Sequence, residues 1–164
     1  AARGLAPRVV VLHHHRHVHF VAVEQPGGRR DQIDHQRSRF VMRFAQMQRR
    51  AKRLLKTYDE KGALDTTYPY PVQVWQFGNE LQMTALGGEV VVDYSLLIKY
   101  ELGKDNQFVI GYANDVCAYI PSLRVLREGG YEGAESMIYY GFHGPWAPQV
   151  QDDIMKTVHE LTGR

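Results

Sequence analysis

A carboxylate at the end of a predicted strand is the first residue that could do chemistry. Glu89 follows the apolar stretch Leu81–Leu86 and the pair Gly87-Gly88, and a helix is predicted over Val90–Leu102. Glycines let the backbone turn sharply and let another group approach closely. A carboxylate placed there points into the crevice where open α/β sheets bind ligands. The alternative is that Glu89 only favours the N-terminus of the following helix.

Two tyrosines follow a second predicted strand, Phe108–Tyr112. Both Tyr119 and Tyr131 belong to the long loop predicted over Asn114–Gly133. A tyrosine phenol can bind a metal ion or donate a hydrogen bond to a developing oxyanion. If the two predicted strands are parallel neighbours, Glu89 and this loop lie at the same sheet edge. The alternative is that both tyrosines pack half-buried with solvated hydroxyl groups.

Histidine and cysteine add two weaker candidates. The segment 13–19 is histidine-rich, and histidines two apart on a strand can chelate zinc, although a solvated tract that binds metals adventitiously is the other interpretation. Cys117 is the only cysteine, which excludes an intrachain disulfide. We expect Cys117 to be a small buried side chain rather than a nucleophile.

Four blocks stand in a characteristic order and spacing: YPYPVQVW at 68–75, ALGGE at 85–89, GYAN at 111–114 and GGYEGA at 129–134. Together they resemble the neutral/alkaline, non-lysosomal ceramidase family, most closely the bacterial branch that reads ALGGEVVVDY. The resemblance covers about residues 46–162. It implies that the chain is the C-terminal portion of a larger catalytic domain.

The resemblance implies a zinc-dependent amide hydrolase that cleaves the N-acyl amide bond of ceramide-like sphingolipids. Family members hold one zinc ion with two histidines, a glutamate and a tyrosine. Glu89 and Tyr119 match the last two and are the expected metal ligands. Tyr131 matches the tyrosine that contacts the scissile amide and is the expected catalytic residue. Asp93, Asn114 and Asp115 are candidates for orienting these ligands, or else ordinary surface and turn residues.

Two departures from the family pattern bear on activity. The family's Pro-Gly-Glu turn is Gly-Gly-Glu here, at 87–89. The blocks that carry the two zinc histidines do not occur in the chain, nor do the family's proton-donor histidine and substrate-holding arginine. A glutamate and a tyrosine are too few ligands for tight zinc binding. We therefore expect an incomplete site without the upstream half of the domain, with weak or no hydrolysis by this chain alone.

Charge is distributed unevenly along the sequence. Residues 1–56 hold 13 Lys or Arg against 3 Asp or Glu, whereas the whole chain has a net charge of only +2. Residues 1–43 form a His/Arg-rich segment for which two interpretations stay open: a basic, disordered arm, or non-native sequence from a shifted reading frame. An alternative function is binding to an anionic surface or nucleic acid, but no nucleic-acid motif is present, so none is expected. A non-catalytic relative of the family is a further alternative.

Periodicity predicts the remaining elements. An apolar stripe from Phe44 to Tyr58 predicts a helix from about Phe44 that stops at Gly62. Val72–Phe77 reads as a strand joined to Leu81–Leu86 by a two-residue turn, Gly78-Asn79. Ser136–Tyr140 suggests a short strand, and Pro148 precedes a last helix with Val150, Ile154, Val158 and Leu161 on one face. The prediction is an α/β fold, a partial layered sheet with flanking helices over residues 44–164.

Sequence signals for membranes and export are weak. The apolar runs are far shorter than the ~20 residues that span a bilayer. The chain shows no signal-peptide pattern of its own. The family resemblance implies a secreted or periplasmic protein that meets a ceramide-like lipid substrate, with peripheral membrane contact.

Overall fold

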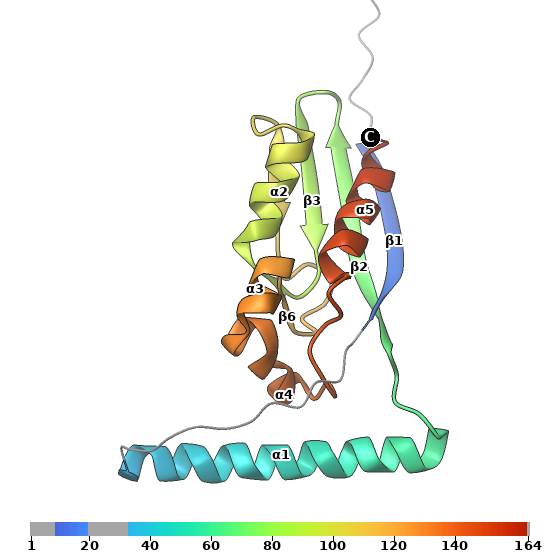
Figure 1. Ribbon diagram of the computed structural model, residues 1–164. Coiled ribbons are helices and arrows are strands. Elements are labelled where there is room, and N and C mark those ends of the chain that lie inside the picture. The colour runs from blue at the N-terminus through green and yellow to red at the C-terminus, as the bar shows by residue number, and fades with distance from the viewer. Residues whose placement is uncertain (1–8, 20–32, 164) are drawn as a thin grey trace, which may run out of the picture.

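The computed structural model describes residues 9–19 and 33–163, with side chains from residue 44 to residue 163. Its larger sheet has the strand order β1-β2-β3-β5 (Figure 1). Strand β1 (Val9–His19) pairs antiparallel with β2 (Thr67–Phe77), which pairs antiparallel with β3 (Leu81–Leu86). Strand β5 (Gln107–Ile110) runs parallel to β3. The α/β class is therefore confirmed, and the two strands that precede the candidate site residues are parallel neighbours.

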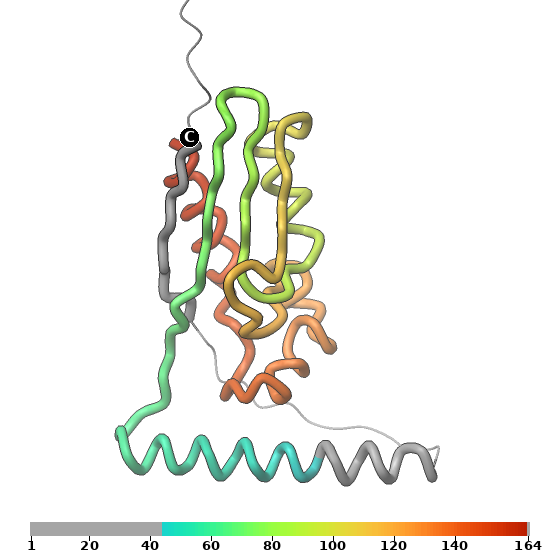
Figure 2. Tube along the Cα trace, turned by 180° about the vertical axis from the view of Figure 1, so that it is seen from behind, coloured from blue at the N-terminus to red at the C-terminus, as the bar shows by residue number. Residues whose placement is uncertain are grey.

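Two helices cover one face of this sheet. Helix α2 (Val92–Leu102) makes the crossover from β3 to β5, and α5 (Val150–Thr162) packs against β1 and β2. Seen from behind, the strands lie in front of both helices (Figure 2). The apolar core lies between the helices and the covered face of the sheet. Its fully buried side chains include Tyr70, Val72, Leu86, Tyr94, Ile98, Val150, Ile154 and Val158.

The segment after β5 folds into short elements beneath α2. Strand β6 (Tyr119–Ile120) pairs in parallel with β4 (Glu89–Val90), and α3 (Leu123–Glu128) follows. A single π-helical turn, η1 (Tyr131–Glu135), leads into α4 (Met137–Tyr140). The predicted long loop is thus largely structured.

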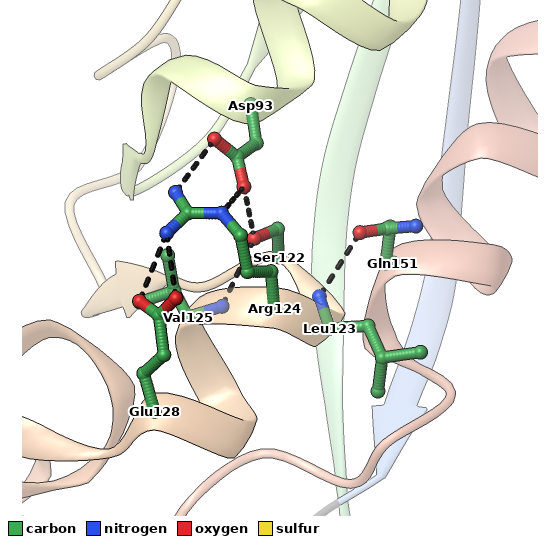
Figure 3. Close-up of polar contacts among 7 residues, drawn as sticks. All are labelled: Asp93, Ser122, Leu123, Arg124, Val125, Glu128 and Gln151. Atoms are coloured by element: carbon green, nitrogen blue, oxygen red, sulfur yellow. Dashed lines mark hydrogen bonds and ion pairs between the residues drawn. The ribbon is translucent and has the colours of Figure 1, made fainter.

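A polar network ties this segment to α2 and α5. The Ser122 hydroxyl caps α3 by accepting from the Val125 amide, and it donates to the Asp93 carboxylate at the start of α2 (Figure 3). Arg124 contacts both Asp93, with an N–O distance of 3.0 Å, and Glu128, at 2.9 Å. These contacts give Asp93 a structural role between helices.

Helix α1 (Ile33–Lys61) lies across one end of the sheet (Figure 1). It touches the body through polar contacts, since Arg50 donates to the Phe142 carbonyl and Arg53 to the Gly141 carbonyl. Its predicted apolar stripe is mostly open to solvent, and Leu55 is 63% exposed. Arg50 and Arg53 of this helix therefore contact the body, whereas most of the predicted apolar stripe is not buried.

Several predicted elements differ from the structure. Helix α1 begins at Ile33, before the expected start, and ends at Lys61, just before Gly62, as predicted. The short apolar runs Val9–Leu12 and Val18–Val23 predict two strands, but one continuous strand covers Val9–His19. Residues 20–23 lie outside the described part. Phe77 pairs with Leu81, so the hairpin loop has three residues rather than two.

The predicted strand over Ser136–Tyr140 is wrong. Met137–Tyr140 is helical, because the Ser136 carbonyl accepts from the amides of Tyr139 and Tyr140. Gly141 then ends the turn in the left-handed conformation. Met137 of this helix is buried, whereas Tyr139 is 44% exposed.

Candidate metal-ligand and amide-binding site

The turn between β3 and β4 sets the position of Glu89. Gly88 has a φ of +65°, and a Cβ atom there would lie 2.7 Å from the Ala118 carbonyl oxygen and 2.8 Å from Ile120 Cγ1. Only glycine combines this left-handed conformation with so close an approach. The turn therefore places Glu89 directly against the chain segment that carries Tyr119.

Backbone hydrogen bonds fix the two segments to each other. The Gly88 amide donates to the Asp115 carbonyl at 2.7 Å, and the Glu89 amide donates to the Ala118 carbonyl at 2.8 Å. In the parallel pairing of β4 with β6, Glu89 stands opposite Tyr119. The Trp146 indole N–H donates to the Tyr119 carbonyl at 2.8 Å, which anchors β6 from its other side.

The Glu89 carboxylate lies beside two phenols. Its interaction with Tyr119 is the largest cause that raises the pKa of Tyr119 above its usual value, ahead of burial. Its interaction with Tyr112 likewise raises the pKa of Tyr112 to about 12. Both phenols therefore hold their protons at neutral pH.

Tyr131 completes the group from a different element. Its ring lies 5.5 Å from the Tyr119 ring, centroid to centroid, in an edge-to-face arrangement. Tyr139 of α4 lies 6.0 Å from the Tyr131 ring. Burial, followed by the charge of Glu89, raises the pKa of the half-buried Tyr140. The structure thus brings Glu89, Tyr119 and Tyr131 together, as the sequence predicted, while their chemical roles stay predictions.

The neighbouring polar residues support the loop. The Tyr68 hydroxyl donates to the Asp115 carboxylate at 2.5 Å, and the Asn114 amide donates to Gln73 at 2.9 Å. Asn114 has a φ of 66°, a left-handed conformation that asparagine tolerates better than most residues. These contacts account for Asn114 and Asp115 as residues that shape the 111–119 loop.

Cys117 is a buried thiol in the same loop. Burial, followed by the charge of Asp115, raises the pKa of Cys117 to about 12. The thiol is therefore protonated at neutral pH, which is the opposite of an activated nucleophile. This environment agrees with the predicted role as a small buried side chain.

The donor set suits part of a metal site. Glu89 and Tyr119 supply carboxylate and phenol oxygens, and zinc accepts oxygen ligands beside nitrogen and sulfur. Among the described side chains, no group of three or more His, Cys, Asp and Glu residues is placed to hold a metal ion. The histidine-rich strand β1 lies at the sheet edge opposite β5, with β2 and β3 between them, and its side chains lie outside the described part.

Sequence reasoning missed Tyr112 as a member of this group. The predicted strand ended at Tyr112, and the end of a strand parallel to β3 was the available signal.

No helix within the described residues is long and apolar enough to cross a bilayer. Comparison with family models, curated proteins and solved structures gave no match.

Proposed function

We propose that this chain carries part of the catalytic site of a zinc-dependent amide hydrolase. The observation that supports the proposal most directly is the parallel pairing of Glu89 with Tyr119, with the Tyr131 ring 5.5 Å from that of Tyr119. The ceramidase-like sequence blocks supply the substrate class, the N-acyl amide of ceramide-like sphingolipids. A location outside the cytoplasm and peripheral contact with a membrane belong to the same proposal and rest on that resemblance alone.

Each residue has a defined task in this proposal. Glu89 and Tyr119 would hold the zinc ion, which when bound lowers the pKa of a water molecule toward roughly 7. Tyr131 would donate a hydrogen bond from its hydroxyl group to the amide carbonyl oxygen, where negative charge develops during hydrolysis. Removing one such donor typically raises the barrier by about 3–4 kcal/mol.

The uncovered face of the sheet supports a larger catalytic domain. Trp75, Met83 and Phe108 stand side by side across β2, β3 and β5, on the face opposite the buried Val74 and Thr84. Phe108 is 58% exposed, and no described helix covers this face (Figure 2). Contiguous apolar surface of this kind typically marks an interaction surface. We therefore place the chain within a larger domain that supplies further zinc ligands.

The test is zinc-dependent release of fatty acid from a short-chain N-acyl sphingosine. We expect slow release, because two ligands hold zinc loosely, and we expect Tyr131→Phe to reduce it to the background rate. Tyr139→Phe removes a neighbouring phenol of the same cluster and is the matched control, which should keep the wild-type rate. Equal rates for wild type and Tyr131→Phe, or release that a chelator leaves unchanged, would refute the proposal.

A further inference from the structure

Positive charge is concentrated in helix α1. The helix contains nine Lys or Arg residues against three Asp or Glu residues, a net charge of +6. Residues 62–164 contain six Lys or Arg against thirteen Asp or Glu, a net charge of −7. The two charges are therefore segregated in space, because α1 lies across one end of the sheet (Figure 1).

Contacts define the side of α1 that faces the body. Arg50 and Arg53 donate to backbone carbonyl groups of the body, and Leu54 and Thr57 line the groove between the helix and the body. Positions three and four apart lie on the same face of a helix, so these four side chains share one side. The remaining sides of α1 are available for another partner.

The apolar stripe of α1 lies next to the body-facing side and is open to solvent. Phe44, Met47, Leu55 and Tyr58 are each half or more exposed. Their spacing places them along one face of the helix. Large apolar side chains that are grouped and exposed in this way typically mark an interaction surface.

A row of exposed cations runs alongside the apolar stripe. This cationic row consists of Arg49, Lys52 and Lys56, spaced three and four apart. Lys56 also pairs with Glu60 of the same helix at 3.7 Å, an exposed ion pair that contributes little. An apolar stripe beside a cationic row, on a helix of 29 residues, is typical of helices that lie in the plane of a membrane interface.

We propose that α1 is a membrane-docking helix that lies on an anionic lipid surface. The apolar stripe enters the headgroup region, and the cationic row contacts lipid phosphates. The acidic body is repelled by the same surface, so the charge segregation turns α1 toward the bilayer.

Charge and exposure together select a membrane over other partners. Nucleic acid would match the charge of α1 but would leave the apolar stripe in water. A second copy of the chain that packed α1 against α1 would bring two helices of net positive charge together, which opposes association. An anionic bilayer satisfies both features, since it offers negative headgroups above an apolar interior.

The inference goes beyond the proposed function, because it depends on neither zinc nor hydrolysis. It also rests on the structure of α1 rather than on the sequence blocks at 68–134. Vesicle binding without amide hydrolysis would therefore support the inference alone. Hydrolysis of a soluble short-chain substrate without vesicle binding would overturn the inference and leave the proposed function standing.

Co-sedimentation of the intact chain with lipid vesicles measures the contribution of charge. We expect binding to vesicles of phosphatidylcholine mixed with phosphatidylglycerol, little binding to phosphatidylcholine alone, and weaker binding at high salt. Arg49→Gln combined with Lys52→Gln should weaken binding to the mixed vesicles about 25-fold, since each basic residue near an anionic surface contributes about 1 kcal/mol. Lys104→Gln combined with Lys156→Gln removes the same charge from exposed positions of the body and should bind like wild type.

A second variant measures the contribution of the apolar stripe. Leu55→Gln should weaken binding to the mixed vesicles about tenfold, because the leucine no longer enters the apolar region. Leu96→Gln alters a similarly exposed leucine of α2 and should keep the wild-type affinity. Both positions are open to solvent, so both variants should fold, and circular dichroism checks that they do.

Three results would overturn the membrane-docking role. The first is wild-type vesicle affinity in both α1 variants, which would assign the binding to another part of the chain. The second is a wild-type chain that binds duplex DNA but not the mixed vesicles. The third is a dimer that light scattering detects in wild type but not in Leu55→Gln, which would make the apolar stripe a contact between copies of the chain.

Discussion

Glu89 owes its position to the glycine that precedes it. Gly88→Ala places a Cβ atom 2.7 Å from the Ala118 carbonyl oxygen in a left-handed conformation, so the β4–β6 pairing must shift. We expect this substitution to lower the free energy of unfolding by about 3 kcal/mol, from backbone strain and steric overlap together. Urea-induced unfolding, followed by circular dichroism, measures the loss.

Gly78 offers a matched control in the β2–β3 hairpin. Its φ is +58°, but nothing lies within 4 Å of a Cβ atom built there. Gly78→Ala should therefore lower the free energy of unfolding by the cost of backbone strain alone, about 1 kcal/mol. Similar losses for the two substitutions would mean that the close approach of Gly88 to Ala118 does not hold Glu89 in place.

Among the residues of the candidate site, the sequence predicts Glu89, Tyr119 and Tyr131 but not Tyr112. A strand, two glycines and a carboxylate form a local pattern that can be recognised without coordinates. A tyrosine with a positive φ leaves no such pattern, because its conformation depends on a hydrogen bond to Gly88, distant in sequence. The sequence therefore predicts only that Tyr112 ends a strand.

Among the elements, the contact between α2 and α3 depends on one carboxylate. Hydrogen bonds from Arg124 and then from Ser122 lower the pKa of Asp93 below its usual value of 3.8, and desolvation opposes them. A group whose pKa is lower in the folded state stabilises the fold above its unfolded pKa and loses that stabilisation as the pH falls through the folded pKa. The ion pair should therefore stabilise the protein at neutral pH and weaken below about pH 4.

Asp93→Asn tests this linkage. The variant should be less stable than wild type by about 0.5 kcal/mol near neutral pH, because the Arg124 side chain is 58% exposed and solvent screens the ion pair. The difference should shrink as the pH is lowered from about 4 to about 2, because the wild-type carboxyl is then protonated too. Asp105→Asn, in the exposed turn after α2, is the control. A difference between wild type and Asp93→Asn that is independent of pH would contradict the account.

Elements with a clear period could be predicted, and short ones could not. Leu81–Leu86 and the last helix stand where alternation and helical spacing placed them. The helix over Met137–Tyr140 has only four residues, too few for a period to show. The two-residue strands β4 and β6 exist only through their mutual pairing, which local sequence does not encode.

The sheet has helices on one face and no described helix on the other (Figures 1 and 2). The uncovered face carries the exposed Phe108. Helix α1 touches the body through arginines and leaves an open groove of about 710 Å³ beside Tyr68 and His143. A helical period predicted the helix but not the face it would present. Which face packs depends on a partner surface, and periodicity carries no information about that surface.

Zinc titration of the intact chain, followed by ultraviolet difference spectroscopy, tests most directly whether Glu89 and Tyr119 share a metal ion. The account predicts a weak, saturable phenolate band in wild type and in Tyr100→Phe, a control in which an 88% exposed tyrosine of α2 is replaced. Glu89→Gln and Tyr119→Phe should abolish the band. A band that persists in Tyr119→Phe, or none in wild type at saturating zinc, would contradict the account.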